Sequence, residues 1–185
     1  AADEYDTQGA TVFLFSDGGL SVNKGNYEGY QISGTALTIS EGGTYVLSGS
    51  CADGSVTVKK GTKGVTLVLE GISLTSADTA PLCFNKSTEV TVVVASGTQN
   101  TLSDSEKNND DTYPENERAE NAVLKCKDGS AVTLCGGGAL SLSANGKNGI
   151  KSGASTEEEG EASLTIRQLT LNITAQVNDA INAEQ

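Results

Sequence analysis

The chain has 185 residues, enough for one substantial domain, and a formal net charge of −12. This charge repels nucleic-acid phosphates and anionic membrane surfaces, and no apolar run approaches the roughly 18 residues of a membrane span, so we expect neither nucleic acid nor membrane insertion. Acidity favours hard cations such as calcium and also keeps a secreted protein soluble. The opening Ala1-Ala2-Asp3 is typical of a protein after signal-peptide removal, so we expect a secreted, extracellular or cell-surface location.

Residues 1–45 lack the repeat that dominates the rest of the chain. They contain Tyr27, Tyr30 and Tyr45, and their last residues lead into the first alternating run, Gly43–Leu47. We predict that residues 1–45 form an N-terminal cap, because the exposed terminal edge of a repeating β structure is an aggregation hazard.

Residues 46–185 show short alternating runs of apolar residues that recur at a regular spacing. Val65-Thr66-Leu67 recurs 25 residues later as Val90-Thr91-Val92. A block of a turn residue followed by alternating apolar positions begins at Asp53, Thr79, Asn121, Asn148 and Asp179. A polar insertion at 103–119 and a smaller one near 155–161 account for the two longer gaps.

A unit of about two dozen residues with three short strands is the rung of a β-helix. A β-sandwich also has many short strands, but it does not explain why the insertions leave the repeat intact. We therefore predict an all-β single structural domain, a three-sided parallel β-helix over residues 46–185.

Alternation assigns the side chains to faces. We expect three successive runs to stack: Val65, Leu67 and Leu69, then Val90, Val92 and Val94, then Val132 and Leu134. Ala122, Leu124 and Cys126 are expected to point inward beside Leu82 and Phe84, and Cys83 and Cys135 to point outward.

The four cysteines, Cys51, Cys83, Cys126 and Cys135, allow three complete pairings. Disulfides and free buried thiols are both open. Structural zinc is not expected, because the chain has no histidine and no CxxC spacing.

Several segments resemble a bacterial secreted family of carbohydrate-binding domain proteins. They are, in order, Gly43–Gly49 with Ala52-Asp53-Gly54, Val65–Ile72, Gly97–Leu102 and the Asn/Asp-Ala/Gly-Ile turns, and the resemblance runs from about Thr11 to the C-terminus. It implies a right-handed parallel β-helix, similar to pectate lyases but without an established lyase activity, that binds calcium and cellulose-like or acidic plant polysaccharides. Two departures are that family domains usually have more rungs and often carry Asp where this chain has Asn148.

The turn residues of successive rungs predict a metal site. Strands stack about 4.8 Å apart, so equivalent corner residues would place carboxylate and amide oxygens within reach of one calcium ion. The alternative is an asparagine-type ladder in which these side chains bond only the next turn. The candidate ligands are Asp53, Asn121, Asn148 and Asp179, flanked by Asp78, Glu120 and Asn178.

The polar insertion carries seven acidic residues on what we expect to be a flexible excursion: Asp104, Glu106, Asp110, Asp111, Glu115, Glu117 and Glu120. They could surround an ion or a partner, but most charge runs are solvated faces. For sugar binding, Tyr27, Tyr30 and Tyr113 are the candidate aromatic platforms, with Lys147 and Lys151 as hydrogen-bonding candidates.

No catalytic residue is predicted, because without histidine the commonest general base is missing. We therefore expect a non-catalytic, calcium-stabilised polysaccharide-binding domain. Two alternatives stay open. One is an extracellular structural, fibre or adhesion subunit that self-associates end to end through its open terminal rung. The other is a calcium-dependent polysaccharide lyase whose base would be Lys125, Lys127, Lys147, Lys151 or Arg167.

Overall fold

The computed structural model describes residues 5–184 and is all-β, with two sheets and no helix among these residues. The seven-stranded sheet contains β3 (Tyr30–Ser33), β4 (Ala36–Ile39), β6 (Ser55–Val58), β8 (Leu82–Phe84), β11 (Ala122–Cys126), β14 (Asn148–Ser152) and β17 (Ile181–Ala183). The ten-stranded sheet contains β1 (Thr11–Ser16), β2 (Gly19–Asn23), β5 (Gly43–Cys51), β7 (Val65–Thr75), β9 (Glu89–Val94), β10 (Gln99–Ser103), β12 (Ala131–Cys135), β13 (Ala139–Ala144), β15 (Ser163–Ile166) and β16 (Thr170–Ala175). Within residues 5–184 we find no helix long and apolar enough to cross a membrane.

The pairing is mixed but mostly parallel. β1 with β2 and β3 with β4 are antiparallel, and the other paired strands run parallel to their neighbours. The expected stacking is confirmed, because Val90 pairs with both Val65 and Val132, and Leu124 pairs with Leu82. The alternating apolar residues therefore form columns across the strands, as the repeat predicted.

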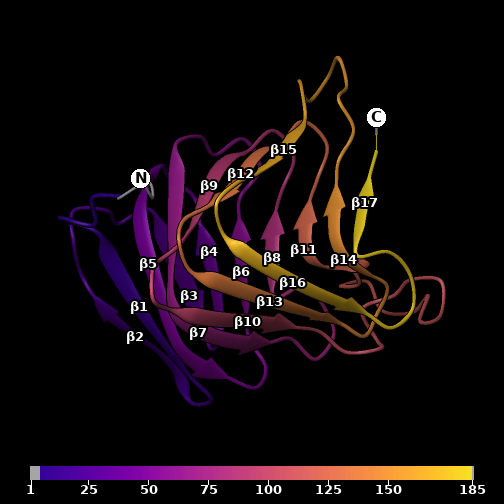
Figure 1. Cartoon of the computed structure of the whole chain (residues 1–185), viewed down its shortest axis with the longest axis horizontal. Coiled ribbons are helices and arrows are strands. Elements are labelled where there is room, and N and C mark those ends of the chain that lie inside the picture. Colours follow the sequence, from indigo (N-terminus) through magenta and orange to yellow (C-terminus); the bar gives the residue numbers. More distant parts are fainter. Residues whose placement is uncertain (1–4, 185) are drawn as a thin grey trace.

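The ten-stranded sheet divides into two arms at β7. Val65–Leu69 of this strand pair with β9, whereas Ser73–Thr75 pair with β10. Gly71 lies at the bend with a φ of 83°, a conformation that glycine adopts without strain. The buried Asn100 side chain accepts hydrogen bonds there from the backbone N–H groups of Gly71 (2.8 Å) and Ile72 (2.9 Å). In Figure 1, β9, β12 and β15 of one arm lie in the upper part of the view, and β10, β13 and β16 of the other arm lie in the lower part. The labels of β6, β8 and β11, from the seven-stranded sheet, lie between them.

The core is one large cluster to which both sheets contribute buried residues. Its strand pairing crosses the predicted boundary at residue 45, because β5 begins at Gly43 and pairs in parallel with β1. The division into a cap and rungs stays a prediction. At the C-terminal end, the side chains of Ile166, Val177 and Ile181 are exposed.

One detail of the predicted repeat is wrong by one residue. The turn blocks aligned Asn121 with Asn148, whereas the structure pairs Asn148 with Ala122. The buried apolar residues set the register, since Leu124 lies beside Ile150, and a one-residue slip would turn one of these side chains away from the core.

All four cysteines are free and buried. Cys126 lies in the main core, as predicted. Cys135 belongs to a second, smaller cluster with Val46, Val68 and Val93, which is separate from the main core as its outward position predicted. This cluster is buried because residues near the N-terminus, among them Tyr5 and Val12, pack against it.

Candidate functional site

The insertion between β10 and β11 is anchored by buried polar side chains. Asn108 is fully buried, and its amide donates to Asp104 Oδ2 (2.9 Å) and to the carbonyl of Ala122 (2.9 Å). Its Oδ1 accepts from the N–H groups of Glu120 (2.7 Å) and Asn121 (3.2 Å). The expectation of a flexible excursion is therefore wrong, because one asparagine ties both ends of the insertion together.

Asp104 continues this network toward the next strand connection. Its Oδ1 accepts from the N–H groups of Asn145 (2.7 Å) and Gly146 (3.2 Å). Burial raises the pKa of the Asp104 carboxyl, and the hydrogen bonds from Asn145, Asn108 and Gly146 partly offset that rise. The other acidic residues of the insertion are exposed, apart from the half-buried Glu120, so most of the acidic run is a solvated face.

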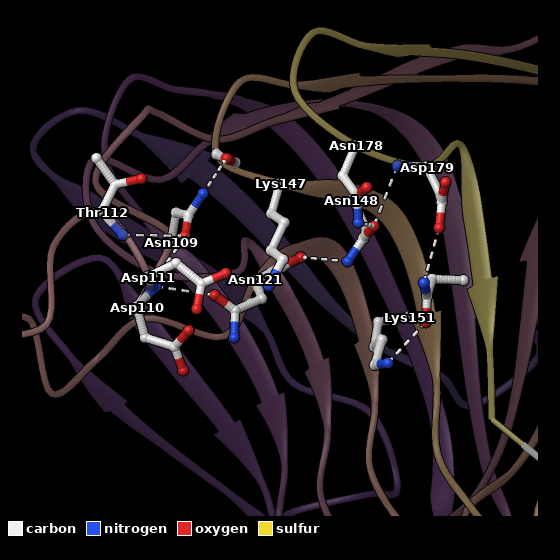
Figure 2. Close-up of polar contacts among 12 residues, drawn as sticks. Asn109, Asp110, Asp111, Thr112, Asn121, Lys147, Asn148, Lys151, Asn178 and Asp179 are labelled. Atoms are coloured by element: carbon white, nitrogen blue, oxygen red, sulfur yellow. Dashed lines mark hydrogen bonds and ion pairs between the residues drawn. The ribbon is translucent and has the colours of Figure 1, made fainter.

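Three of the predicted metal ligands meet at one corner of the fold. Asn148 Oδ1 accepts from Asn178 Nδ2 (2.9 Å) and from the Asp179 N–H (3.2 Å). Asn148 Nδ2 donates to the carbonyl of Asn121 (3.2 Å), which extends the chain of contacts to the previous corner (Figure 2). This arrangement is the asparagine-type ladder that the sequence left open.

The other predicted ligands bond elsewhere. Asp53 accepts from the N–H of Ala77 (3.0 Å), and Asp78 pairs with Arg118 (2.9 Å). Glu120 pairs with Lys127 (3.0 Å), and Asn121 Oδ1 accepts from the Asp110 N–H (2.9 Å). Across residues 5–184, no three His, Cys, Asp or Glu side chains lie close enough to hold a metal ion. The calcium site stays a prediction, now centred on Asn148, Asn178 and Asp179.

The predicted aromatic platforms lie in different parts of the molecule. The half-buried Tyr30 packs edge-on against Phe13, with ring centroids 4.8 Å apart, and Tyr27 packs against Tyr45 at 6.0 Å. Tyr113 lies on the insertion, where the charge of Glu106 raises the pKa of its hydroxyl. These tyrosines do not form a common strip.

The two predicted lysines also have separate surroundings. Lys147 pairs with Asp111 of the insertion (2.6 Å). Lys151 lies on β14, where it donates to Asn182 Oδ1 (2.6 Å) and pairs with Glu184 (2.9 Å).

Lys151 is one of four lysines around a hollow on the outer face of the seven-stranded sheet. The hollow has a volume of about 350 Å³, and the insertion lines part of it through Asp110, Ala119, Glu120 and Asn121. Lys125 of β11 pairs in register with Lys151 of β14 and with Cys83 of β8. Its chain neighbours Leu124 and Cys126 are buried in the core, so Lys125 faces outward into this hollow.

Sequence reasoning considered Lys125, Lys127 and Lys151 one at a time, did not consider Lys86, and missed that the four cluster. The signal was available in the repeat, because Lys125 and Lys151 are equivalent residues of neighbouring strands. Lys86 and Lys127 complete the four, and they come from the turns that follow β8 and β11. The approach of the insertion could not be predicted, because it depends on the buried Asn108.

Two comparisons with known proteins give the same family description. A family model described as "Carbohydrate-binding domain-containing protein" matches residues 33–185. A protein of Acetivibrio thermocellus with the same description is 32% identical over 130 residues, which cover 70% of this chain but 44% of that protein. This chain therefore corresponds to less than half of that relative.

A solved structure has a similar fold. It is described as a polysaccharide lyase-like protein from C. thermocellum, in a gadolinium derivative, and has a TM-score of 0.57 with 17% sequence identity. The match covers 95% of this chain and 94% of that one. At this identity the likeness concerns the fold alone.

Proposed function

Because the chain belongs to the family of carbohydrate-binding domain-containing proteins, we propose that it is a non-catalytic, extracellular domain that binds plant cell-wall or acidic polysaccharides. The observation that carries the proposal is the polar hollow on the outer face of the seven-stranded sheet, which the insertion helps to line. The hollow offers ammonium donors and carboxylate or amide acceptors, the groups that hydrogen-bond sugar hydroxyls. A long polymer can also contact several parts of one face at once, which raises avidity.

Part of the proposal is that the chain winds as a right-handed parallel β-helix. Its support is that the chain passes repeatedly between the two sheets, while each strand of a column pairs in parallel with its equivalent one turn along. Parallel strands joined by crossovers are right-handed in about 98% of cases. An experimental structure with a left-handed winding, or with a different order of strands in the two sheets, would overturn this part.

Calcium belongs to the proposal in a restricted form. Asn148, Asn178 and Asp179 lie together, but Asp179 is the one carboxylate among them, and calcium takes six to eight oxygens. We therefore propose a weak site at this corner, completed by oxygens of the bound glycan such as uronate carboxylates. Asp179→Asn should then weaken binding in calcium while leaving binding in chelator unchanged.

The test of the function is retention on insoluble polysaccharide. The protein is incubated with cellulose and with polygalacturonate gel, each with millimolar calcium or with EDTA, and the bound fraction is measured. We expect retention on at least one polysaccharide, and a lower retention on polygalacturonate in EDTA. The absence of retention on every polysaccharide would contradict the binding function. An ultraviolet-absorbing unsaturated product released from polygalacturonate would contradict its non-catalytic character.

A second candidate is end-to-end self-association. The exposed Ile166, Val177 and Ile181 at the C-terminal end favour it, because they offer apolar surface to another chain. Size-exclusion chromatography over a hundredfold concentration range tests it. A constant monomer mass across that range would remove this candidate.

A further inference from the structure

Three of the four lysines that line the hollow have an acidic partner, and one does not. Lys127 pairs with Glu120 (3.0 Å), Lys151 with Glu184 (2.9 Å), and Lys86 lies 4.0 Å from Glu159. The ammonium group of Lys125 has neither a hydrogen bond nor an ion pair with any residue in the described range 5–184. The hollow therefore contains one ammonium group whose charge is not neutralised by a direct partner.

The position of Lys125 makes this ammonium available to a ligand. The residue is half-buried on the outer face of β11, between Cys83 and Lys151 in the neighbouring strands. Burial lowers the pKa of Lys125, and the charge of Glu120 partly offsets that change. A half-buried cation without a partner is costly, and an incoming anion would remove that cost.

We propose that this hollow is a subsite for a carboxylate group on a polysaccharide, with Lys125 as the residue that selects uronate sugars over neutral ones. The inference rests on the proposed function and specifies it. A single isolated carboxylate per sugar fits the site better than a dense anion. Asp110 and Glu120 line the same hollow and the chain is strongly acidic, so closely spaced sulfates or phosphates would be repelled.

The experiment compares Lys125→Gln with a matched control, Lys24→Gln, which removes an exposed lysine outside the hollow. Affinity electrophoresis is run in gels that contain polygalacturonate, its fully methyl-esterified form or dextran sulfate. Lys125→Arg is included because it keeps the positive charge. The melting temperature of each variant shows whether it is folded.

We expect Lys125→Gln to weaken binding to polygalacturonate about tenfold or more, since hydrogen bonds to charged groups are the stronger ones. Binding to the methyl-esterified polymer should be unchanged, Lys125→Arg should retain most of the affinity, and Lys24→Gln should bind as the wild type does. Weak wild-type binding to dextran sulfate is also expected.

Three results would overturn the inference. They are equal affinity of Lys125→Gln and Lys24→Gln for polygalacturonate, equal wild-type affinity for the charged and esterified polymers, or tighter binding to dextran sulfate. If the wild type still binds a neutral glycan in any of these cases, the proposed function stands and the subsite alone fails. If the wild type binds no glycan, both fail together.

Discussion

The strand columns and the insertion at residues 104–121 are stabilised in different ways. In the columns, Val90 lies between Val65 and Val132, so each side chain meets a neighbour of the same kind. In the insertion, the buried Asn108 makes four hydrogen bonds to four different groups. The columns distribute stability over many similar contacts, whereas the insertion depends on a few polar side chains, among them Asn108 and Asp104.

This difference has a consequence for tolerance to substitution. A column accepts Val, Leu or Ile at the same position, since burying apolar area is non-directional. At position 108 of the insertion we expect only asparagine to be tolerated, because no other side chain offers the same donors and acceptors in that space. We therefore expect loss of volume to be the damaging change in the columns, and loss of hydrogen bonds in the insertion.

The largest effect is expected for Leu67→Ala in the columns. Leu67 is fully buried between Tyr45 and Val92, and truncation would leave a cavity that costs about 2–5 kcal/mol. Urea denaturation measures the free energy of unfolding. Leu14→Ala is the control, because Leu14 is 51% exposed, and it should cost less than about 0.5 kcal/mol. Similar losses in the free energy of unfolding for both variants would contradict the idea that the buried columns stabilise the fold.

Asn108→Ala should have the next largest effect, about 2–3 kcal/mol, because buried donors and acceptors lose their partners. The variant should also loosen the insertion, so trypsin should cut faster after Lys107 and Arg118, which are exposed. Asn23→Ala, an exposed asparagine of β2, serves as the control. An unchanged cleavage rate would show that Asn108 does not anchor the insertion.

The same difference explains what could be predicted from the sequence. The columns were predictable, because alternation and a fixed spacing are visible in the order of residues, and the pairing of Val65 with Val90 follows from them. The predicted register was wrong by one residue at Asn121, because the prediction aligned the turn residues and not the buried Leu124 and Ile150. Turn residues tolerate such a shift, whereas core residues do not.

The site could be predicted only in part. The corner contacts of Asn148, Asn178 and Asp179 follow from their places in the repeat. The hollow does not follow, because it needs the insertion to fold back against β11, and hydrogen bonds between residues far apart in the chain leave no periodic signal. Likewise, Tyr27 and Tyr30 could serve either the core or a ligand, and only their contacts with Tyr45 and Phe13 show that they pack on the core.

Asn148→Ala tests whether a buried asparagine with exposed partners contributes less to stability than Asn108 does. Asn148 is as deeply buried as Asn108, but its partners Asn178 and Asp179 are exposed and can bond water after the substitution. We expect a cost of about 1 kcal/mol in the free energy of unfolding, less than for Asn108→Ala. The exposed Asn172→Ala on β16 is the control. A cost equal to that of Asn108→Ala would mean that the exposure of the partners does not decide the effect.

The smallest effect is expected at the second insertion, near residue 159, and depends on pH. The buried Glu159 accepts a hydrogen bond from Ser87 (2.7 Å) and pairs with Lys60 (3.0 Å), and these contacts lower its pKa below the ordinary value of 4.5. A carboxyl group with a lowered pKa stabilises the folded state above its ordinary pKa, and this contribution is lost as pH falls through the folded-state value. Glu159→Gln should therefore reduce the melting temperature at pH 7, by less than Asn148→Ala, and the gap in melting temperature from the wild type should narrow below about pH 4.5.

Glu157→Gln, which changes an exposed carboxylate of the same loop, should show no gap at either pH. An equal gap for Glu159→Gln at pH 7 and pH 3.5 would mean that packing, and not the charge of Glu159, attaches this loop to the strand columns.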